Sequence, residues 1–175
     1  GPASDKSAGA NGRICVQTDP RLYRHKAGLV AQAREFDAPA RNISVKIPAT
    51  KTGSEAMDEA TSRGISVNAT VSFTVSQAVA AGEAIERGLV RREAEGLDVS
   101  TMGPVVTIMG GRLDDWLKKV VARDAITIAP GYLEWAGVAA LKHADHVLQA
   151  RGFRSHTPTT PIPTPPASNR TTGGR

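Results

Sequence analysis

The sequence predicts an α/β protein, a partial TIM (β/α)8 barrel with about four central βα units. Three segments alternate apolar with hydrogen-bonding side chains, as strands between two different environments do: 13–18, 43–48 and 65–72. Helical sequence follows each of them, which favours a parallel sheet covered on both faces. A barrel meets this requirement by turning the apolar faces to outer helices and the polar faces inward. Function then lies at the carboxyl ends of the strands.

The second of these strands carries a lysine. Ile43, Val45 and Ile47 form its apolar face, whereas Ser44 and Lys46 lie on the other face. A single lysine on an alternating strand is more often a solvated surface residue. Because the strands before and after it repeat the pattern, we expect Lys46 to point into the barrel, near the carboxyl end of its strand.

The neighbouring strands are expected to divide in the same way. The first carries Cys15, Gln17 and Asp19 on its polar face. The third has Ile65, Val67, Ala69 and Val71 on its apolar face, and Ser66, Asn68, Thr70 and Ser72 on its polar face. A fourth strand, 104–109, is too uniformly apolar for alternation to orient it.

Helix boundaries follow from capping signals. An aspartate–proline pair at 19–20 predicts a helix that runs to about Phe36. The capping box at 52–55 predicts a second helix, ending near Arg63 before a glycine. Another capping box, 74–77, opens a third.

Apolar spacing predicts which helix faces are buried. The third helix should pack through Val75, Ala78, Val79, Gly82, Ile85 and Leu89, and expose Glu83, Glu86, Arg87, Arg91 and Arg92 to solvent. A fourth helix has a stripe at Leu113, Trp116, Leu117, Val120 and Val121. A fifth, about 130–150, has buried candidates Leu133, Val138, Leu141 and Val147.

Composition predicts one folded unit, 12–154, between two disordered segments. Residues 1–11 are small and polar, and residues 155–175 are rich in proline and threonine. The chain has 175 residues, fewer than the roughly 250 of a typical TIM barrel. Without an initiator methionine, we expect it to begin inside a longer protein or after a processed tag.

Charge and cysteine content limit the classes of partner and the compartment that we expect for this chain. The net charge of +5 suits phosphorylated substrates, but the basic residues are scattered and aromatic content is 4%, so no nucleic-acid partner is expected. No apolar run approaches the roughly 20 residues of a membrane helix, so we expect no membrane partner. The single cysteine excludes an internal disulfide and fits a reducing cytoplasm. His143 and His146 lack a third metal ligand, and no glycine loop of nucleotide type occurs.

Three motifs resemble the transaldolase family in order and spacing: 45–50, 64–70 and 111–116. The similarity extends from about Gly12 to about Ser155. It implies transfer of a dihydroxyacetone unit between sugar phosphates through a lysine Schiff base, in the pentose phosphate pathway and without a cofactor. It also implies that the first two and last two barrel strands are missing. The open sheet edges would then favour self-association and poor folding in isolation.

The resemblance makes Lys46 the imine-forming residue. A Schiff-base lysine must be partly neutral, which requires an enclosed, apolar setting. Thr70 matches the threonine that holds a catalytic water. Gln17 replaces the family's glutamate, and an amide can orient a water but cannot act as a general base. Gln17 therefore implies reduced activity or a divergent proton route, and the alternative for it is an ordinary interior polar residue.

The resemblance also implies three substrate-binding residues. Asn68 matches a contact to the substrate hydroxyls, the alternative being a satisfied interior amide. Arg112 matches a phosphate-binding arginine, because a guanidinium forks onto phosphate oxygens. Thr107 and Met109 stand where the family has a serine and an aromatic residue.

Two rival functions remain. A simple Schiff-base aldolase would cleave without transfer, and product analysis with and without an acceptor aldose separates it. A non-catalytic, degenerate fragment belongs to another class, and Gln17 and the missing strands favour it.

Overall fold

The computed structural model describes residues 6, 12–129 and 131–154. Its strands are β1 Ile14–Gln17, β2 Ile43–Pro48, β3 Val67–Ser72 and β4 Val105–Ile108. Its helices are α2 Lys26–Asp37, α3 Lys51–Ser62, α4 Val75–Ala94, α5 Gly110–Arg123 and α6 Ala136–Ala150, with 3₁₀ turns η1 Pro20–Leu22 and η2 Tyr132–Glu134. Apart from Lys6, the segments expected to be disordered lie outside the described residues.

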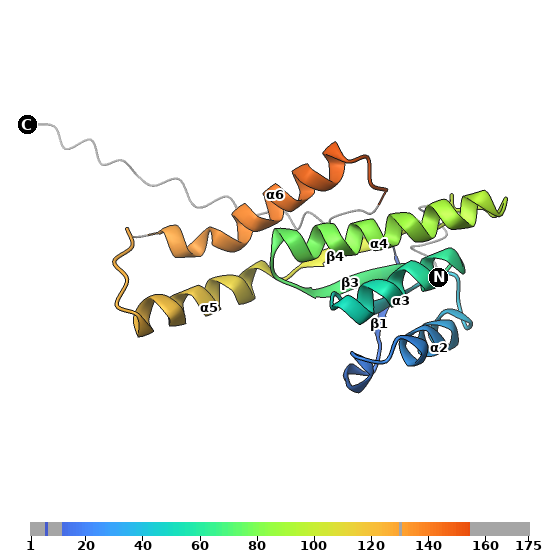
Figure 1. Ribbon diagram of the computed structural model, residues 1–175, viewed down its shortest axis with the longest axis horizontal. Coiled ribbons are helices and arrows are strands. Elements are labelled where there is room, and N and C mark those ends of the chain that lie inside the picture. Colours follow the sequence, from blue (N-terminus) through green and yellow to red (C-terminus); the bar gives the residue numbers. More distant parts are fainter. Residues whose placement is uncertain (1–5, 7–11, 130, 155–175) are drawn as a thin grey trace, which may run out of the picture.

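The four strands form one parallel sheet in the order β1-β2-β3-β4 (Figure 1). Strands that are consecutive in the chain are neighbours in the sheet, and a helical segment follows each of them. This confirms the predicted α/β fold and is the arrangement of a partial (β/α) barrel.

The core lies between the sheet and its helices. The strands contribute five hydrophobic residues that are 0% exposed: Val45, Ile47, Val67, Ala69 and Val106. They pack with helical residues that are equally buried, including Leu29, Ala33, Ala56, Met57 and Ile85. The predicted apolar face of β2 therefore lies in the core, as does that of β3 up to Ala69, whereas Ile14 on the predicted apolar face of β1 is 60% exposed.

The end of β3 departs from the predicted alternation. Ala69 lies opposite Val106 of β4, whereas Ser72 lies opposite Ile108, so β3 contains one extra residue there. Such a β-bulge re-aims the side chains beyond it. The two residues in the bulge are Thr70 and Val71, and the φ of Val71 is +56°.

The bulge overturns the predicted faces of two residues. Ser72, expected on the polar face, pairs with a core residue of β4, is 0% exposed, and has a hydroxyl without a hydrogen-bond partner. Val71, expected in the core, is 42% exposed. The strict period of two fails here because one residue adopts a left-handed backbone conformation.

The first predicted helix is wrong, because the segment forms two elements instead of one. The Asp19 carboxylate accepts a hydrogen bond from the Arg21 amide and caps only the short turn η1. The chain turns again at 23–25 before α2 begins at Lys26. The aspartate–proline pair marks a helical start, but of a single 3₁₀ turn.

The predicted cap of the second helix is displaced by two residues. Thr50, not Thr52, caps α3, and its hydroxyl accepts a hydrogen bond from the Gly53 amide at 2.9 Å. In α4 the prediction is confirmed, since the Thr74 hydroxyl accepts from the Gln77 amide at 3.2 Å.

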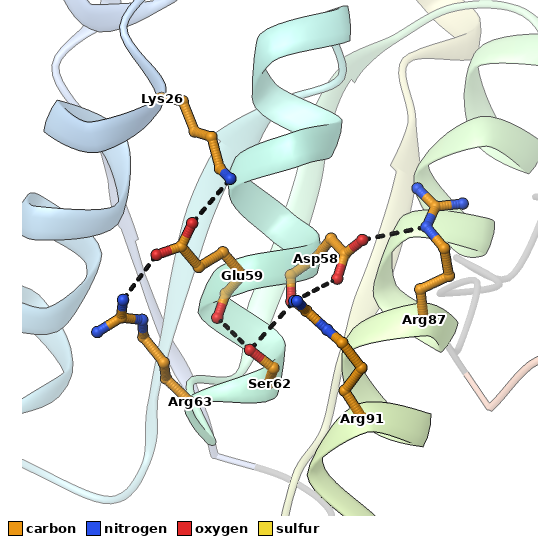
Figure 2. Close-up of polar contacts among 7 residues, drawn as sticks. All are labelled: Lys26, Asp58, Glu59, Ser62, Arg63, Arg87 and Arg91. Atoms are coloured by element: carbon orange, nitrogen blue, oxygen red, sulfur yellow. Dashed lines mark hydrogen bonds and ion pairs between the residues drawn. The ribbon is translucent and has the colours of Figure 1, made fainter.

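Ion pairs tie the outer helices together (Figure 2). On α3, Asp58 binds both Arg87 and Arg91 of α4, at 3.0 and 2.6 Å. The adjacent Glu59 binds Lys26 of α2 at 2.8 Å and Arg63 at 2.6 Å. These charges therefore connect three helices rather than forming the merely solvated surface expected for α4.

The other charges of α4 hold the end of α6. Glu83 pairs with Arg151, and Glu86 accepts from the Arg154 guanidinium at 2.7 Å and from its amide at 3.1 Å. These hydrogen bonds to Glu86 raise the pKa of Arg154. Residues 151–154, which follow α6, are thereby held against α4.

Helices α5 and α6 lie side by side at one end of the molecule (Figure 1). No residue of α5 is buried, and Trp116 of its predicted stripe is 60% exposed. Helix α6 begins at Ala136, later than predicted, and buries Gly137, Ala144 and Leu148. The predicted candidates Val138, Leu141 and Val147 are only half-buried, as is Leu133, which lies in η2. No helix in the described part of the chain is long and apolar enough to cross a membrane.

Candidate active site

The site forms on the polar face of the sheet, along one row of residues. Gln17 of β1 lies opposite Lys46 of β2, which lies opposite Asn68 of β3. Register partners in a sheet point to the same face, so these three side chains share the inner face. Gln17 is exposed, Lys46 is half-buried, and Asn68 is 7% exposed.

The backbone of Lys46 is held by three donors from the last residue of β1 and the residue after it. Its carbonyl accepts from the Thr18 amide at 3.1 Å, the Thr18 hydroxyl at 3.0 Å and the Gln17 side-chain amide at 3.2 Å. The Gln17 NH2 group therefore binds the β2 backbone. Thr18 is 1% exposed, so its hydroxyl contact to Lys46 is screened from water.

Sequence reasoning missed Thr18 as a supporting residue. The signal was its position: Thr18 follows Ile14 and Val16 on the face expected to be apolar. A hydroxyl that replaces an aliphatic side chain there needs a hydrogen-bond partner, because a buried polar group without one is costly.

Asn68, opposite the lysine on β3, forms hydrogen bonds to residues of β1 and β4. Its side-chain oxygen accepts from the Thr107 hydroxyl of β4 at 2.8 Å, and its NH2 group donates to the Cys15 sulfur of β1 at 3.4 Å. Both ends of the amide are therefore engaged, which fixes its orientation. Cys15, an exposed free thiol, is a second neighbour of the site that sequence reasoning did not select.

Thr70 lies two residues beyond Asn68 on the same face. It is opposite Pro48 of β2 and 5% exposed. Its carbonyl accepts from the Ala49 amide at 2.7 Å, so the regular pairing of β2 with β3 persists up to this residue. Thr70 thus stands closer than Lys46 to the carboxyl edge of the sheet.

Arg112 lies on the first turn of α5, directly after β4. It lines a shallow surface hollow with Thr107, Met109, Gly111 and Asp115, among others. Helix α5 begins without a side-chain cap among the described residues, and the exposed Arg112 guanidinium at this helix start is a group suited to an anion. Arg112 is exposed, and no ion pair to it occurs among the described residues.

Two glycines fix the start of α5 against α6. A side chain at Gly137 would place its Cβ only 2.4 Å from the Gly110 carbonyl oxygen, so the two backbones approach more closely than any other residue allows. The Gly137 amide also donates to the Asp114 carboxylate at 2.7 Å. The helix end that carries Arg112 is therefore held by a backbone contact.

The row on the inner face contains no carboxylate. Asp19 follows Gln17 at the end of β1, and its hydrogen bonds with the Arg21 side chain lower the pKa of its carboxyl to about 2. Asp19 is therefore ionised and engaged at neutral pH. No group of three or more His, Cys, Asp or Glu residues that could hold a metal occurs within 12–129 and 131–154.

The parallel sheet and the lysine on its inner face place this chain among α/β proteins of the partial (β/α)-barrel class. The chain belongs to the transaldolase/fructose-6-phosphate aldolase family, whose model matches residues 3–160. This confirms the resemblance found in the sequence motifs.

Individual relatives are bacterial transaldolases. The chain is 38% identical to the transaldolase of Parafrankia sp. (strain EAN1pec) over 117 residues, which is 65% of this chain and 31% of the relative. It is 36% identical to transaldolase 1 of Streptomyces coelicolor over 119 residues, 66% of this chain and 31% of the relative. The transaldolase of Thiobacillus denitrificans is 36% identical over 117 residues, 65% and 32% of the two chains. The chain thus spans about a third of the length of these curated relatives.

Proposed function

We propose that this chain carries a transaldolase-type site, which transfers a dihydroxyacetone unit between sugar phosphates through a Schiff base at Lys46. The observation that supports this most is the shared inner face of Gln17, Lys46 and Asn68, with Arg112 at the end of a neighbouring strand. The proposal places the protein in the cytoplasm and in the pentose phosphate pathway, with residues 12–154 as its folded unit.

The proposed reaction begins at the Lys46 amine. Its lone pair attacks the ketone carbon of a ketose phosphate, and loss of water from the adduct forms an imine. The protonated imine draws electrons from the bond between its neighbouring carbon and the next carbon along the sugar chain. The hydroxyl on that next carbon gives its proton to water as the bond breaks, so an aldose phosphate leaves and an enamine remains on Lys46. The three-carbon unit stays on the lysine until the aldehyde of an acceptor re-forms the bond, and water then frees the ketose.

Thr70 and Gln17 would handle the water in this scheme. Thr70 would hold it by its hydroxyl, above the lysine. Gln17 would orient it through the side-chain oxygen, since its NH2 group donates to the Lys46 carbonyl. Because an amide does not take up a proton at neutral pH, proton transfer would depend on water or on the substrate hydroxyls. We therefore expect turnover well below that of a site with a carboxylate here.

Asn68, Thr107 and Arg112 would bind the substrate. The fixed Asn68 amide offers hydrogen bonds to sugar hydroxyls, with Thr107 orienting it. Arg112 and the uncapped start of α5 would bind the phosphate, in keeping with the preference of anions for helix amino ends.

Product analysis tests this function. The chain is incubated with fructose 6-phosphate, with and without an acceptor aldose phosphate, alongside the variant Lys46→Met. Transaldolase function predicts a new ketose phosphate only when the acceptor is present, and none from the variant. Release of free dihydroxyacetone without an acceptor would identify a simple aldolase instead.

Gln17 favours one further candidate, a non-catalytic member of the family. Restoring the carboxylate with Gln17→Glu separates the two. If the variant turns over fructose 6-phosphate while the parent chain does not, the fold is competent and the parent is a degenerate enzyme.

A further inference from the structure

Val71 has the most unusual backbone of the candidate site. Among the non-glycine residues described, only Val71 and Ala125 have a positive φ, at +56° and +51°. A β-branched residue rarely adopts this region, because its side chain clashes with its own backbone. Strained residues and β-bulges occur frequently beside active sites, where the surrounding structure holds them in place.

The bulge brings the Val71 side chain to the inner face. Between the last regular pair and the next one, two residues of β3, Thr70 and Val71, lie opposite the single residue Thr107 of β4. Thr107 points inward, since its hydroxyl donates to Asn68. Ser72 has moved to the core side and is fully buried, whereas Val71 is 42% exposed. Val71 therefore joins Thr70 and Thr107 at the inner carboxyl edge.

This position lies on the path between the two ends of a bound substrate. In the sheet, β3 stands between β2, which carries Lys46, and β4, which leads into the first turn of α5 and Arg112. The Met109 amide that precedes this turn donates to the Ser72 carbonyl at 2.8 Å, directly beyond the bulge. Val71, at the end of β3, therefore lies between the strand that carries Lys46 and the strand that leads to Arg112.

We propose that Val71 is a specificity-determining residue, which contacts the carbon chain of a phosphorylated ketose between Lys46 and Arg112. The inference rests on the proposed function. Val71 is the apolar residue beside Thr70 of β3 and Thr107 of β4. Its side chain therefore packs against the C–H groups of the sugar and excludes water from that part of the substrate. An unphosphorylated three-carbon ketone, bound at Lys46 alone, does not extend to Val71.

The test compares two ketones in the full chain. Borohydride trapping measures the rate of adduct formation at Lys46 with fructose 6-phosphate and with dihydroxyacetone. Glycine adopts positive φ freely, so Val71→Gly keeps the bulge and removes only the side chain. We expect it to slow trapping of fructose 6-phosphate about tenfold, in line with the effect of small apolar groups in specific pockets, and to leave dihydroxyacetone unchanged.

A second variant and a control complete the design. Val71→Ile keeps the β-branched side chain and adds one methylene, and is expected to slow the phosphorylated ketone selectively as well. Val90→Ala alters a valine on α4 that is also exposed, at 53%, and should change neither rate. If Val71→Gly does not fold, Val71→Ile decides the matter.

The proposal would be overturned if the ratio of the two rates stayed the same in both Val71 variants. This holds whether both rates are unchanged or both fall equally, and an equal fall would indicate an effect on Lys46 itself. Absence of any Lys46 adduct in the parent chain is a different result. It would reject the proposed function and this inference together.

Discussion

At the scale of single residues, the site is organised by contacts to backbone atoms. The Lys46 carbonyl receives three donors from the last residue of β1 and the residue after it, and the Asn68 amide spans from β1 to β4. Such contacts fix the register of the strands and the direction of their side chains before any substrate binds. They make the inner face a rigid support for a lysine whose own side chain stays half-exposed.

Replacing Thr18 with valine tests how much the hydrogen bond to the Lys46 carbonyl stabilises the fold. The change keeps the shape of the side chain and removes the hydroxyl that donates to the Lys46 carbonyl at 3.0 Å. We expect the free energy of unfolding to fall by about 1 kcal/mol, the usual net value of a neutral hydrogen bond, measured by urea denaturation. Thr18→Ser retains the donor and is the control. Equal destabilisation by both variants would indicate lost packing instead.

The carboxyl of Asp19 should titrate at unusually low pH. Its pKa is lowered from 3.8 to about 2 by the Arg21 side chain. The folded value lies below the unfolded one, so the stabilising contact is fully present above about pH 4 and is lost as the pH falls through 2. NMR titration of the carboxyl carbon checks this. Arg21→Met should return the midpoint toward 3.8, and an unchanged midpoint would contradict the assigned cause.

Alternation located this row of residues from the sequence alone, because β1, β2 and the first part of β3 keep the regular period of two. The bulge could not be predicted in this way. Valine has no tendency toward positive φ, and the shift arises from pairing with β4, a strand whose uniform apolarity leaves its register unspecified. The proposed contribution of Val71 therefore became visible only in the structure.

At the scale of elements, helix caps and interhelical charges set how the outer layer meets the sheet. Helix α3 is central, since it binds α2 through Glu59 and α4 through Asp58 (Figure 2). Thr50, which caps α3, and Thr52, which the sequence predicted as the cap, lie two residues apart and both carry a hydroxyl. The residue type therefore does not distinguish the two positions. In the structure β2 ends at Pro48 and α3 already begins at Lys51, which places the cap at Thr50.

Two threonine variants test the observed cap. Thr50→Ala removes the hydroxyl that binds the Gly53 amide, and we expect it to lower the free energy of unfolding by about 1 kcal/mol. Thr52→Ala, at the position expected from the sequence, should change it by less than about 0.5 kcal/mol, as surface substitutions do. Chemical denaturation measures both, and the reverse order would restore the original assignment.

At the scale of the whole molecule, the sheet has two edges, β1 and β4, each of four residues. A strand without a neighbour exposes backbone donors and acceptors, which favours pairing with another chain. The chain also presents exposed aromatic residues on α5 and around η2, including Trp116 and Tyr132. Either surface could support association of copies.

A charged residue on β1 tests whether copies of the chain associate through this sheet edge or through the aromatic surface on α5. Ile14 on β1 is 60% exposed, and Ile14→Lys places a charge there that opposes strand pairing. We expect the concentration-dependent mass seen by sedimentation to fall toward the monomer in this variant. Trp116→Lys is the matched control on α5 and should leave association unchanged. The opposite pattern would place the contact on α5.

We propose that Lys46 forms a Schiff base, and borohydride reduction in the presence of fructose 6-phosphate tests this proposal. Mass spectrometry of the intact chain and its peptides then locates the adduct. We predict one adduct per chain, on Lys46, retained in Lys51→Arg and lost in Lys46→Arg. No adduct in a folded chain, or modification spread evenly over the lysines, would contradict the account.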